Sequence, residues 1–262
     1  MLCKRLIPVL YLMDGYIVRS ERFEEHQIIG HPIHHVERLV DWDVDELIII
    51  DISRGNPEFD TFRPDYRNKG PKDLIEFVRM TAVECNIPLT IGGRIRSVED
   101  ATIRIQNGAD KIAVNSLLKY NPGVVTEIAH KFGSQAVVSS VDYRTVDSKP
   151  MAFVDSGRTA TGHDVISWAQ HAERLGAGEI LLVSIDRDGM GSGFDCAVID
   201  AVASEAGIPV IACSGAGVDP HFKRCLAETA TSAVAAGNIF HFTEHAYPRI
   251  KSYLKKSGLP VR

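Results

Sequence analysis

Two aspartates lie where apolar, strand-like runs of this chain end. Asp142 closes the run AVVSSVD, and Asp188 follows the run ILLVSI. Carboxylates at such positions suit general acid/base catalysis or the binding of a substrate hydroxyl. A lone aspartate after a strand is, however, more often a turn or helix-cap residue. Tyr11 ends the first run, LIPVLY, so a phenol stands there instead of a carboxylate.

Glycine and small polar residues follow four other apolar runs. Backbone amides in such loops bind phosphate, so the loops predict two phosphate cradles and a ligand with a phosphate at each end. For one Gly-Gly pair a tight turn is the simpler explanation, but four loops in symmetric pairs favour phosphate. The first-half cradle is Gly93, Arg94, Asn115 and Ser116; the second-half cradle is Cys213, Ser214, Gly215, Ala216, Ala236 and Gly237; Asp188 and Gly189 are further candidate substrate contacts.

The elements that must position these residues are short apolar runs that alternate with amphipathic stretches of helical period. Strands that are apolar throughout and separated by helices are typical of a covered parallel sheet. Eight such units in about 250 residues predict an α/β fold, the (β/α)8 TIM barrel, whose βα loops carry the chemistry. The expected strands are 6–11, 47–52, 88–91, 111–114, 136–142, 180–185, 209–213 and 232–236, and the expected helices are 32–42, 71–84, 97–107, 121–132, 163–175, 195–206, 218–228 and 243–256.

An internal repeat supports a closed barrel. DELIIIDISRGN is echoed by GEILLVSIDRDG, and IPLTIGG is echoed by IPVIACSG. The first half carries extra residues at 54–71, which are rich in Gly, Pro, Asn and charge and predict a long loop after the second strand. We therefore expect one domain over 1–262, built from half-barrels of about 1–130 and 131–262.

Composition and charge limit the classes of partner that the chain is expected to bind. The net charge is −5 and the Lys and Arg residues are scattered, so neither nucleic acid nor a membrane surface is an expected partner. The cysteines are far apart and no run reaches 18 apolar residues, which is typical of a cytoplasmic protein. We expect no cofactor and no metal. His34 and His35 would point in different directions on a helix, and we expect both at the surface.

Motifs over nearly the whole chain resemble one family. MLCKRLIPVL, VDELIIIDI, GADKIAVNS, FGSQAVV, SIDRDG and AAGNIFHF look like the HisF family, the cyclase subunits of imidazole glycerol phosphate synthase. Only 54–71 and a loop at 143–160 fall outside the likeness. The resemblance implies a (β/α)8 barrel that receives ammonia from a glutaminase subunit docked at its bottom. The ammonia is then used at the top face to cleave and cyclise a bis-phosphate substrate.

The resemblance also assigns residues at the bottom of the barrel. The family's ring of charges, which gates the ammonia, corresponds to Arg5, Glu46, Lys111 and Glu179. The alternative is a salt-bridged plug that only fixes the base of the barrel. Asp110 resembles a family residue that faces the glutaminase.

The top face departs from the family pattern. Of the family's two catalytic aspartates, Asp142 matches the second, whereas Tyr11 replaces the first. A phenol with a pKa near 10 cannot act as a carboxylate base does at neutral pH. Arg94 replaces a glycine and would either bind an anion or fill its site. Further departures at phosphate positions are Cys213, Ser214 and Arg19, the last in place of a lysine.

A HisF-like paralogue of surface-polysaccharide gene clusters resembles the chain in these respects, including FEEHQIIGHPI at 23–33. This resemblance implies that a glutaminase partner supplies ammonia to a sugar amidotransferase, which builds an acetamidino group on a nucleotide-linked or lipid-linked sugar. We favour this function. The alternatives are the cyclase of histidine biosynthesis and a non-catalytic scaffold or activator of a glutaminase.

Overall fold

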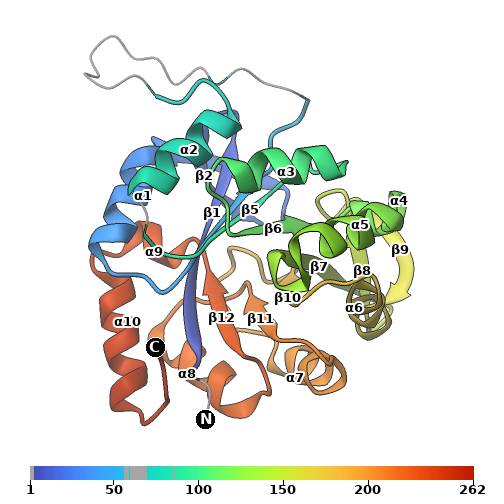
Figure 1. Cartoon of the computed structure of the whole chain (residues 1–262). Helices are drawn as coiled ribbons and strands as arrows, with labels where there is room; N and C mark the ends of the chain where they lie inside the picture. Colours follow the sequence, from blue (N-terminus) through green and yellow to red (C-terminus); the bar gives the residue numbers. More distant parts are fainter. Residues whose placement is uncertain (1–2, 56–58, 60–69, 85) are drawn as a thin grey trace.

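Parallel strands close into a barrel in the computed structural model, which describes residues 3–55, 59, 70–84 and 86–262 (Figure 1). Within these residues eight strands follow one another round the barrel in chain order, and Pro8 of the first lies beside Ala236 of the last. The predicted (β/α)8 fold is confirmed. The barrel strands are β1 (Arg5–Met13), β4 (Leu47–Asp51), β5 (Leu89–Gly92), β6 (Lys111–Val114), β7 (Val137–Val146), β10 (Glu179–Ser184), β11 (Val210–Cys213) and β12 (Ala233–Ala236).

Helices between the strands cover the outside of the barrel, as Figure 1 shows. The two ends of the chain lie at the same end of the barrel, where Lys4 bridges to Val261. None of the described helices has the length and apolarity that a membrane span requires. The helices that follow the barrel strands are α1 (Pro32–Asp41), α2 (Leu74–Glu84), α3 (Val98–Gln106), α5 (Pro122–Phe132), α6 (Val165–Arg174), α7 (Cys196–Glu205), α8 (Asp219–Glu228) and α10 (Ala246–Lys256).

The strands bury both of their faces, because alternate side chains point to opposite sides of a sheet. In β1, Leu6 and Leu10 pack outward in the large core against the helices, whereas Ile7 and Val9 belong to the cluster inside the barrel. The inward-facing row of each strand therefore runs from the bottom of the barrel to its top. This alternation decides which side chains meet at each mouth.

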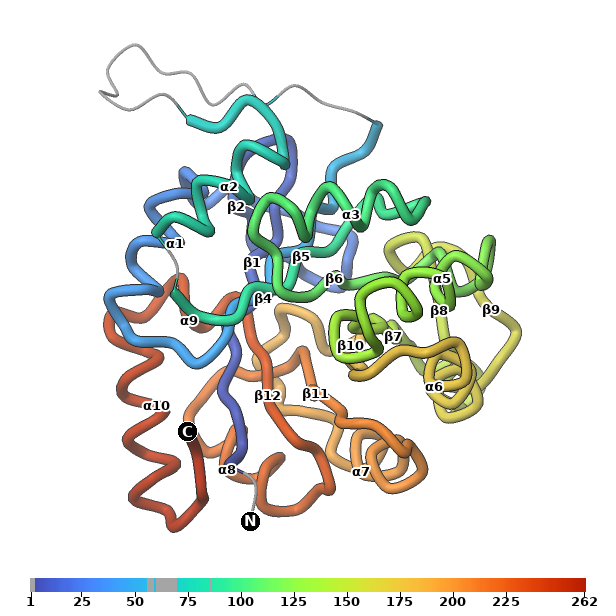
Figure 2. The backbone as a smooth tube through the Cα atoms, viewed as in Figure 1, coloured from blue at the N-terminus to red at the C-terminus, as the bar shows by residue number. Residues whose placement is uncertain are grey.

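Two antiparallel hairpins extend the barrel and were not predicted. One is formed by β2 (Tyr16–Glu21) and β3 (Glu25–Gly30), and the other by β8 (Lys149–Val154) and β9 (Thr159–Asp164). The expectation of a loop at 143–160 is therefore wrong. The tube in Figure 2 shows β8 and β9 beside α6, on the side of the view opposite α10.

The second hairpin also moves a predicted helix boundary. The helix expected from residue 163 begins at Val165, because the Asp164 carboxylate accepts the backbone N–H groups of Ile166 at 3.0 Å and Ser167 at 2.9 Å and so caps the helix. Smaller elements are α4 (Leu117–Tyr120), α9 (Ile239–Phe242) and the 3-10 turn Ser134–Ala136.

The hairpins follow β1 and β7, the first strand of each proposed half-barrel. Lys149 follows Tyr16 at the same spacing as Glu179 follows Glu46, so the hairpins obey the sequence repeat. The division into half-barrels stays a prediction. The proposed insertion at 54–71 falls mostly outside the described residues.

One expectation about histidines is wrong. His34 is on the surface, but His35 is buried, 9% exposed, between α1 and α9. Its ring lies 5.0 Å from that of His241, and Arg38 lies 3.0 Å from its Nδ1 atom. Burial, aided by the Arg38 charge, lowers the pKa of His35 to about 4, so a neutral ring packs there.

Candidate functional site at the two mouths of the barrel

The four charged residues that the resemblance placed at the bottom mouth form a closed ring. Arg5 contacts Glu46 at 2.9 Å and Glu179 at 2.5 Å. Lys111 contacts Glu179 at 2.9 Å and Glu46 at 3.7 Å. They meet because each lies at the bottom of an inward-facing row of its strand. Each cation therefore touches both carboxylates.

The ring is largely buried, which makes its pairing essential. Glu46 is 6% exposed and Glu179 is 5% exposed. Burial would lower the pKa of Arg5, but its hydrogen bonds with Glu179 and Glu46 outweigh that effect and raise it. A buried charge without a partner would cost several kcal/mol. The geometry fits both a gate and a structural plug.

Asp110 lies beside the ring, next to Lys111 in the chain. Its side chain is exposed, and one carboxylate oxygen accepts the backbone N–H of Leu89 at 2.8 Å. Asp110 therefore lies at the edge of the bottom face, beside the start of β5, and its carboxylate remains accessible to solvent. Its role in binding a partner stays a prediction.

Apolar side chains fill the barrel between its mouths. They include the small residues Ala113, Ala233 and Ala235, with Ile7 and Leu181 among the larger ones. Tyr11, Phe23 and Ile50 pack against this cluster. These three partly buried side chains mark the start of the top mouth.

Tyr11 faces the acidic candidates across the top mouth. Burial raises the pKa of its phenol, and Cys213, Asp188 and Asp142 raise it further. Its hydroxyl also hydrogen-bonds with the Cys213 thiol. Because Tyr11 lies on the inward-facing row of β1, it brings a neutral group to the position where the resemblance implies a carboxylate.

Two side-chain hydrogen bonds hold Asp142, one from its own strand and one from the loop after β6. The Ser140 hydroxyl donates to Oδ1 at 2.8 Å, and the Asn115 amide donates to Oδ2 at 3.2 Å. Burial raises the pKa of Asp142 to about 7, with Asp188 adding to the rise and the Ser140 bond opposing it. A carboxyl poised near neutrality can give or take a proton.

Asp188 is bound to the first hairpin. Ser20 donates to its Oδ2 atom at 2.6 Å, and the Arg22 amide donates to its carbonyl at 3.0 Å. Burial raises its pKa to about 6, although bonds from Ser20 and the Phe23 amide oppose this. Burial also raises the pKa of Cys213 to about 12, so that thiol is not a nucleophile at neutral pH.

In the first-half cradle, the side chains of Arg94 and Ser116 bind to neighbouring loops of the chain. The Arg94 side chain lies 2.7 Å from Asp51 and donates to the Gly55 carbonyl at 3.1 Å. It therefore turns toward the loop after β4, away from Asn115. Ser116 accepts the backbone N–H of a residue in the β8–β9 turn.

The second-half cradle adjoins the first hairpin. Asn238, just after Gly237, donates to the Ser20 carbonyl at 3.0 Å. Arg19 pairs with Glu21 at 2.8 Å, and its guanidinium lies 5.8 Å from the Phe242 ring centre at the end of α9. The structure thus brings Arg19 to the β12 side of the cradle.

Two glycines of the cradles are required by the chain itself. A Cβ at Gly93 would lie 2.0 Å from the Asp51 carbonyl oxygen, and one at Gly215 would lie 2.2 Å from that of Gly193. Both have positive φ, as do their neighbours Arg94 and Ser214. The tight-turn explanation accounts for these two glycines, whose type alone does not argue for a ligand.

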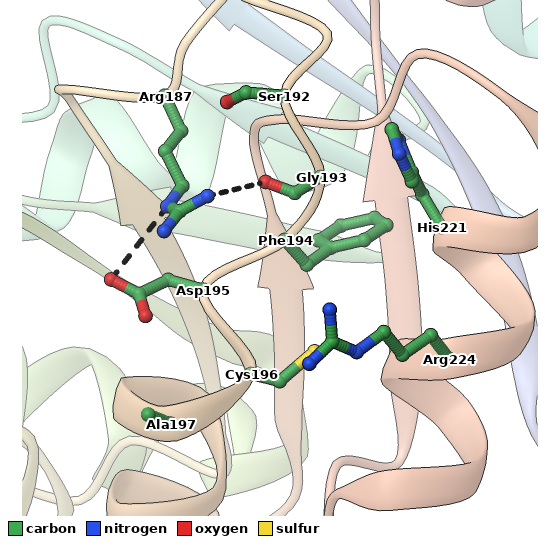
Figure 3. Close-up of a pocket in the computed structure, with 9 residues that line it drawn as sticks. All are labelled: Arg187, Ser192, Gly193, Phe194, Asp195, Cys196, Ala197, His221 and Arg224. Atoms are coloured by element: carbon green, nitrogen blue, oxygen red, sulfur yellow. Dashed lines mark hydrogen bonds and ion pairs between the residues drawn. The ribbon is translucent and has the colours of Figure 1, made fainter.

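A cavity of about 240 Å³ lies behind the loop after β10 and includes no predicted site residue. Figure 3 shows His221 and Arg224 projecting from α8 toward it, with Arg187 and Asp195 on the opposite side. Arg187 pairs with Asp195 at 3.8 Å, and Arg224 pairs with Glu228 at 2.9 Å. Its positive charges are therefore largely compensated.

Sequence reasoning missed several partners of the site. Ser140 lies two residues before Asp142, so the period of a strand could have placed both on one face. No comparable signal in the sequence links Ser20 to Asp188. Among the described residues, no group of three His, Cys, Asp or Glu side chains could hold a metal.

Comparisons with known proteins identify the family of the chain. Residues 5–246 match the model of the histidine biosynthesis protein family. The chain is 38% identical to the imidazole glycerol phosphate synthase subunit HisF of Metallosphaera sedula and 38% identical to that of Streptococcus sanguinis, over the full length of all three proteins. The chain therefore belongs to the histidine biosynthesis protein family, as a full-length relative of HisF subunits.

Proposed function

We propose that this chain is the ammonia-receiving synthase subunit of a glutamine amidotransferase pair. The bottom mouth supports the first part of the proposal. Its closed ring of two cations and two carboxylates stands at the entrance to an apolar interior. Ammonia crosses such an interior as the neutral molecule, because burying an ion is costly. A glutaminase docked on the bottom face would release ammonia at the ring.

Tyr11 is the observation that supports a different acceptor. Cyclase chemistry in the family uses two aspartates, and here one is a phenol whose pKa is raised by burial. Only Asp142 remains of the pair. We therefore propose that the ammonia goes to a sugar amidotransferase, for acetamidino-sugar formation in surface polysaccharide biosynthesis. The class of acceptor follows the resemblance to HisF-like paralogues.

The cyclase of histidine biosynthesis is the second candidate. The full-length identity of 38% to two HisF subunits favours it. The pKa values of about 7 for Asp142 and about 6 for Asp188 also place two carboxyls near neutrality, where general acids and bases work. Under this function, Asp188 would take the role that Tyr11 cannot fill.

Two assays test the proposal, and the second separates the candidates. A glutaminase partner should be activated by this chain, and an unchanged glutaminase rate would refute the ammonia-receiving role, which both candidates share. Ammonia and the bis-phosphate cyclase substrate should then give negligible turnover with this chain. Turnover with that substrate would establish the second candidate.

A further inference from the structure

The second hairpin is bound to the first-half cradle through Asp155, in the turn between β8 and β9. Its backbone N–H donates to the Ser116 hydroxyl at 3.1 Å. The Tyr120 hydroxyl donates to its Oδ2 atom at 2.5 Å, and Lys119 donates to the Ala160 carbonyl at 2.7 Å. These contacts place the Asp155 carboxylate at the cradle.

Asp155 carries a full negative charge at neutral pH. Partial burial acts to raise its pKa, but hydrogen bonds from Tyr120 and Ser116 hold it below its ordinary value. The other donor of the cradle also faces an acid, since Arg94 pairs with Asp51, whose side chain is fully buried. Ser116 and Arg94 of the first-half cradle thus already have a carboxylate of this chain beside them.

The second-half cradle differs. The residues Cys213 to Ala216, Ala236 and Gly237 include no acidic side chain. The buried Ser214 hydroxyl has no oxygen or nitrogen partner among the described residues. Arg19 lies near the end of α9, with its charge paired to Glu21 at 2.8 Å. An anion would meet the Ser214 hydroxyl there and the Asp155 carboxylate at the other cradle.

We propose that Asp155 is a specificity-determining residue, which closes the first-half cradle with the chain's own carboxylate so that the top face takes a ligand charged at one end only. Such ligands are sugar monophosphates and sugars carried on a diphosphate. A phosphate at Ser116 would lie beside a like charge and displace its hydrogen bond, which disfavours it. The inference rests on the proposed function, under which the top face does not serve the bis-phosphate cyclase substrate.

Crystals soaked in inorganic phosphate test the closure directly. The unmutated protein should hold phosphate beside Gly215 and Gly237 and none at Ser116. Asp155→Asn keeps the shape of the side chain but removes its charge, and this variant should hold a second phosphate at Ser116. Phosphate at Ser116 in the unmutated protein, or none there in the variant, would overturn the proposal.

Calorimetry measures the same effect in solution, with a pentose 5-phosphate and a pentose 1,5-bisphosphate as probes. The two should bind the unmutated protein with Kd values within about threefold, whereas Asp155→Asn should bind the bisphosphate at least about tenfold more tightly than the monophosphate. Asp147→Asn, an equal charge change at the exposed turn between β7 and β8, should leave the ratio unchanged. A bisphosphate preference of tenfold in the unmutated protein would refute the closure.

Different experiments test the proposed function and the role of Asp155, so one can be refuted without the other. A glutaminase assay without activation would refute the ammonia-receiving role, and it would leave the ratio of the two Kd values unaffected.

Discussion

The two mouths of the barrel hold charge in opposite ways. At the bottom, Arg5 and Lys111 each contact two buried glutamates, so every charge is compensated. At the top, Asp142 and Asp188 share the mouth with a neutral phenol, and no cation of the described residues forms an ion pair with either carboxylate. The carboxyls there hold their protons to a higher pH. The ring residues at the bottom mouth therefore stay charged, whereas the two carboxyls at the top mouth change their protonation near neutral pH.

The difference fits the proposed function. The ring residues match the types that the resemblance implies, and each cation contacts both carboxylates. At the top mouth the hydrogen bonds that hold Asp142 are present, whereas Tyr11 lies where the resemblance implies a second aspartate. A bottom mouth that is intact, below a top mouth that is altered, fits a subunit that still receives ammonia but passes it to another acceptor.

The largest expected effect concerns cyclase turnover at the top mouth. Supplied with ammonia and the bis-phosphate substrate, the protein should be slower than a two-aspartate site by about 10²–10⁴, the usual cost of one proton-transfer group. Tyr11→Asp should recover part of this rate, and Tyr11→Phe should not. A product assay under saturating ammonia measures it. Turnover of roughly 1 s⁻¹ or faster in the unmutated protein would contradict the changed-acceptor proposal.

The bottom mouth should respond strongly to the loss of one cation. Arg5→Ala leaves Glu46 and Glu179 buried with Lys111 alone, and should lower the free energy of unfolding by about 3–5 kcal/mol. Urea unfolding measures this. Arg224→Ala, which breaks an exposed pair with Glu228, is the matched control and should change the stability far less, because solvent screens an exposed pair. If both variants lowered the free energy of unfolding equally, burial would not strengthen the ion pairs of the ring.

The top mouth should show its charges through pH. Because the folded-state pKa of Asp142 is raised from 3.8 to about 7, its contribution to stability is present below pH 4 and is lost as the pH rises through about 7. Asp142→Asn removes that loss, so above pH 7 the variant should be more stable than the unmutated protein by up to about 4 kcal/mol.

Two measurements check this titration. Unfolding from pH 4 to pH 8 gives the difference in stability, and carboxyl NMR gives the pKa itself. Asp188→Asn is the comparison, with a smaller effect because the pKa of Asp188 is raised only to about 6. A pKa of Asp142 near 4 would remove the contrast between the two mouths.

The smallest expected effect lies at the rim of the bottom face. Asp110→Lys should weaken glutaminase binding by about tenfold, or 1.4 kcal/mol, by reversing an exposed charge. Asp110→Asn keeps an oxygen for the Leu89 amide and should weaken binding less. Calorimetry with the glutaminase partner tests this. If both variants bind as the unmutated chain does, the partner contacts another surface.

Much of the barrel was predictable because its strands are apolar on both faces and its helices are amphipathic. The expected strand at 111–114 matches β6 in full, and the others are displaced by one or two residues at their ends, apart from β1 and β7, which run on beyond their expected ends. The hairpins were missed because TATGHD, which forms β9, shows no apolar alternation and is exposed along most of its length. Its pairing with β8, rather than its composition, makes it a strand.

The sequence by itself determined the barrel, its inward-facing rows and the residue types at each mouth, since these follow from the period of a strand and the repeat of the chain. Only the tertiary structure decided which of those residues are partners. Asp155 and Ser116, like Ser20 and Asp188, are far apart in the chain, and hydrogen bonds between distant loops leave no periodic trace. The raised pKa of Asp142 was equally hidden, because it arises from burial beneath side chains that several strands contribute.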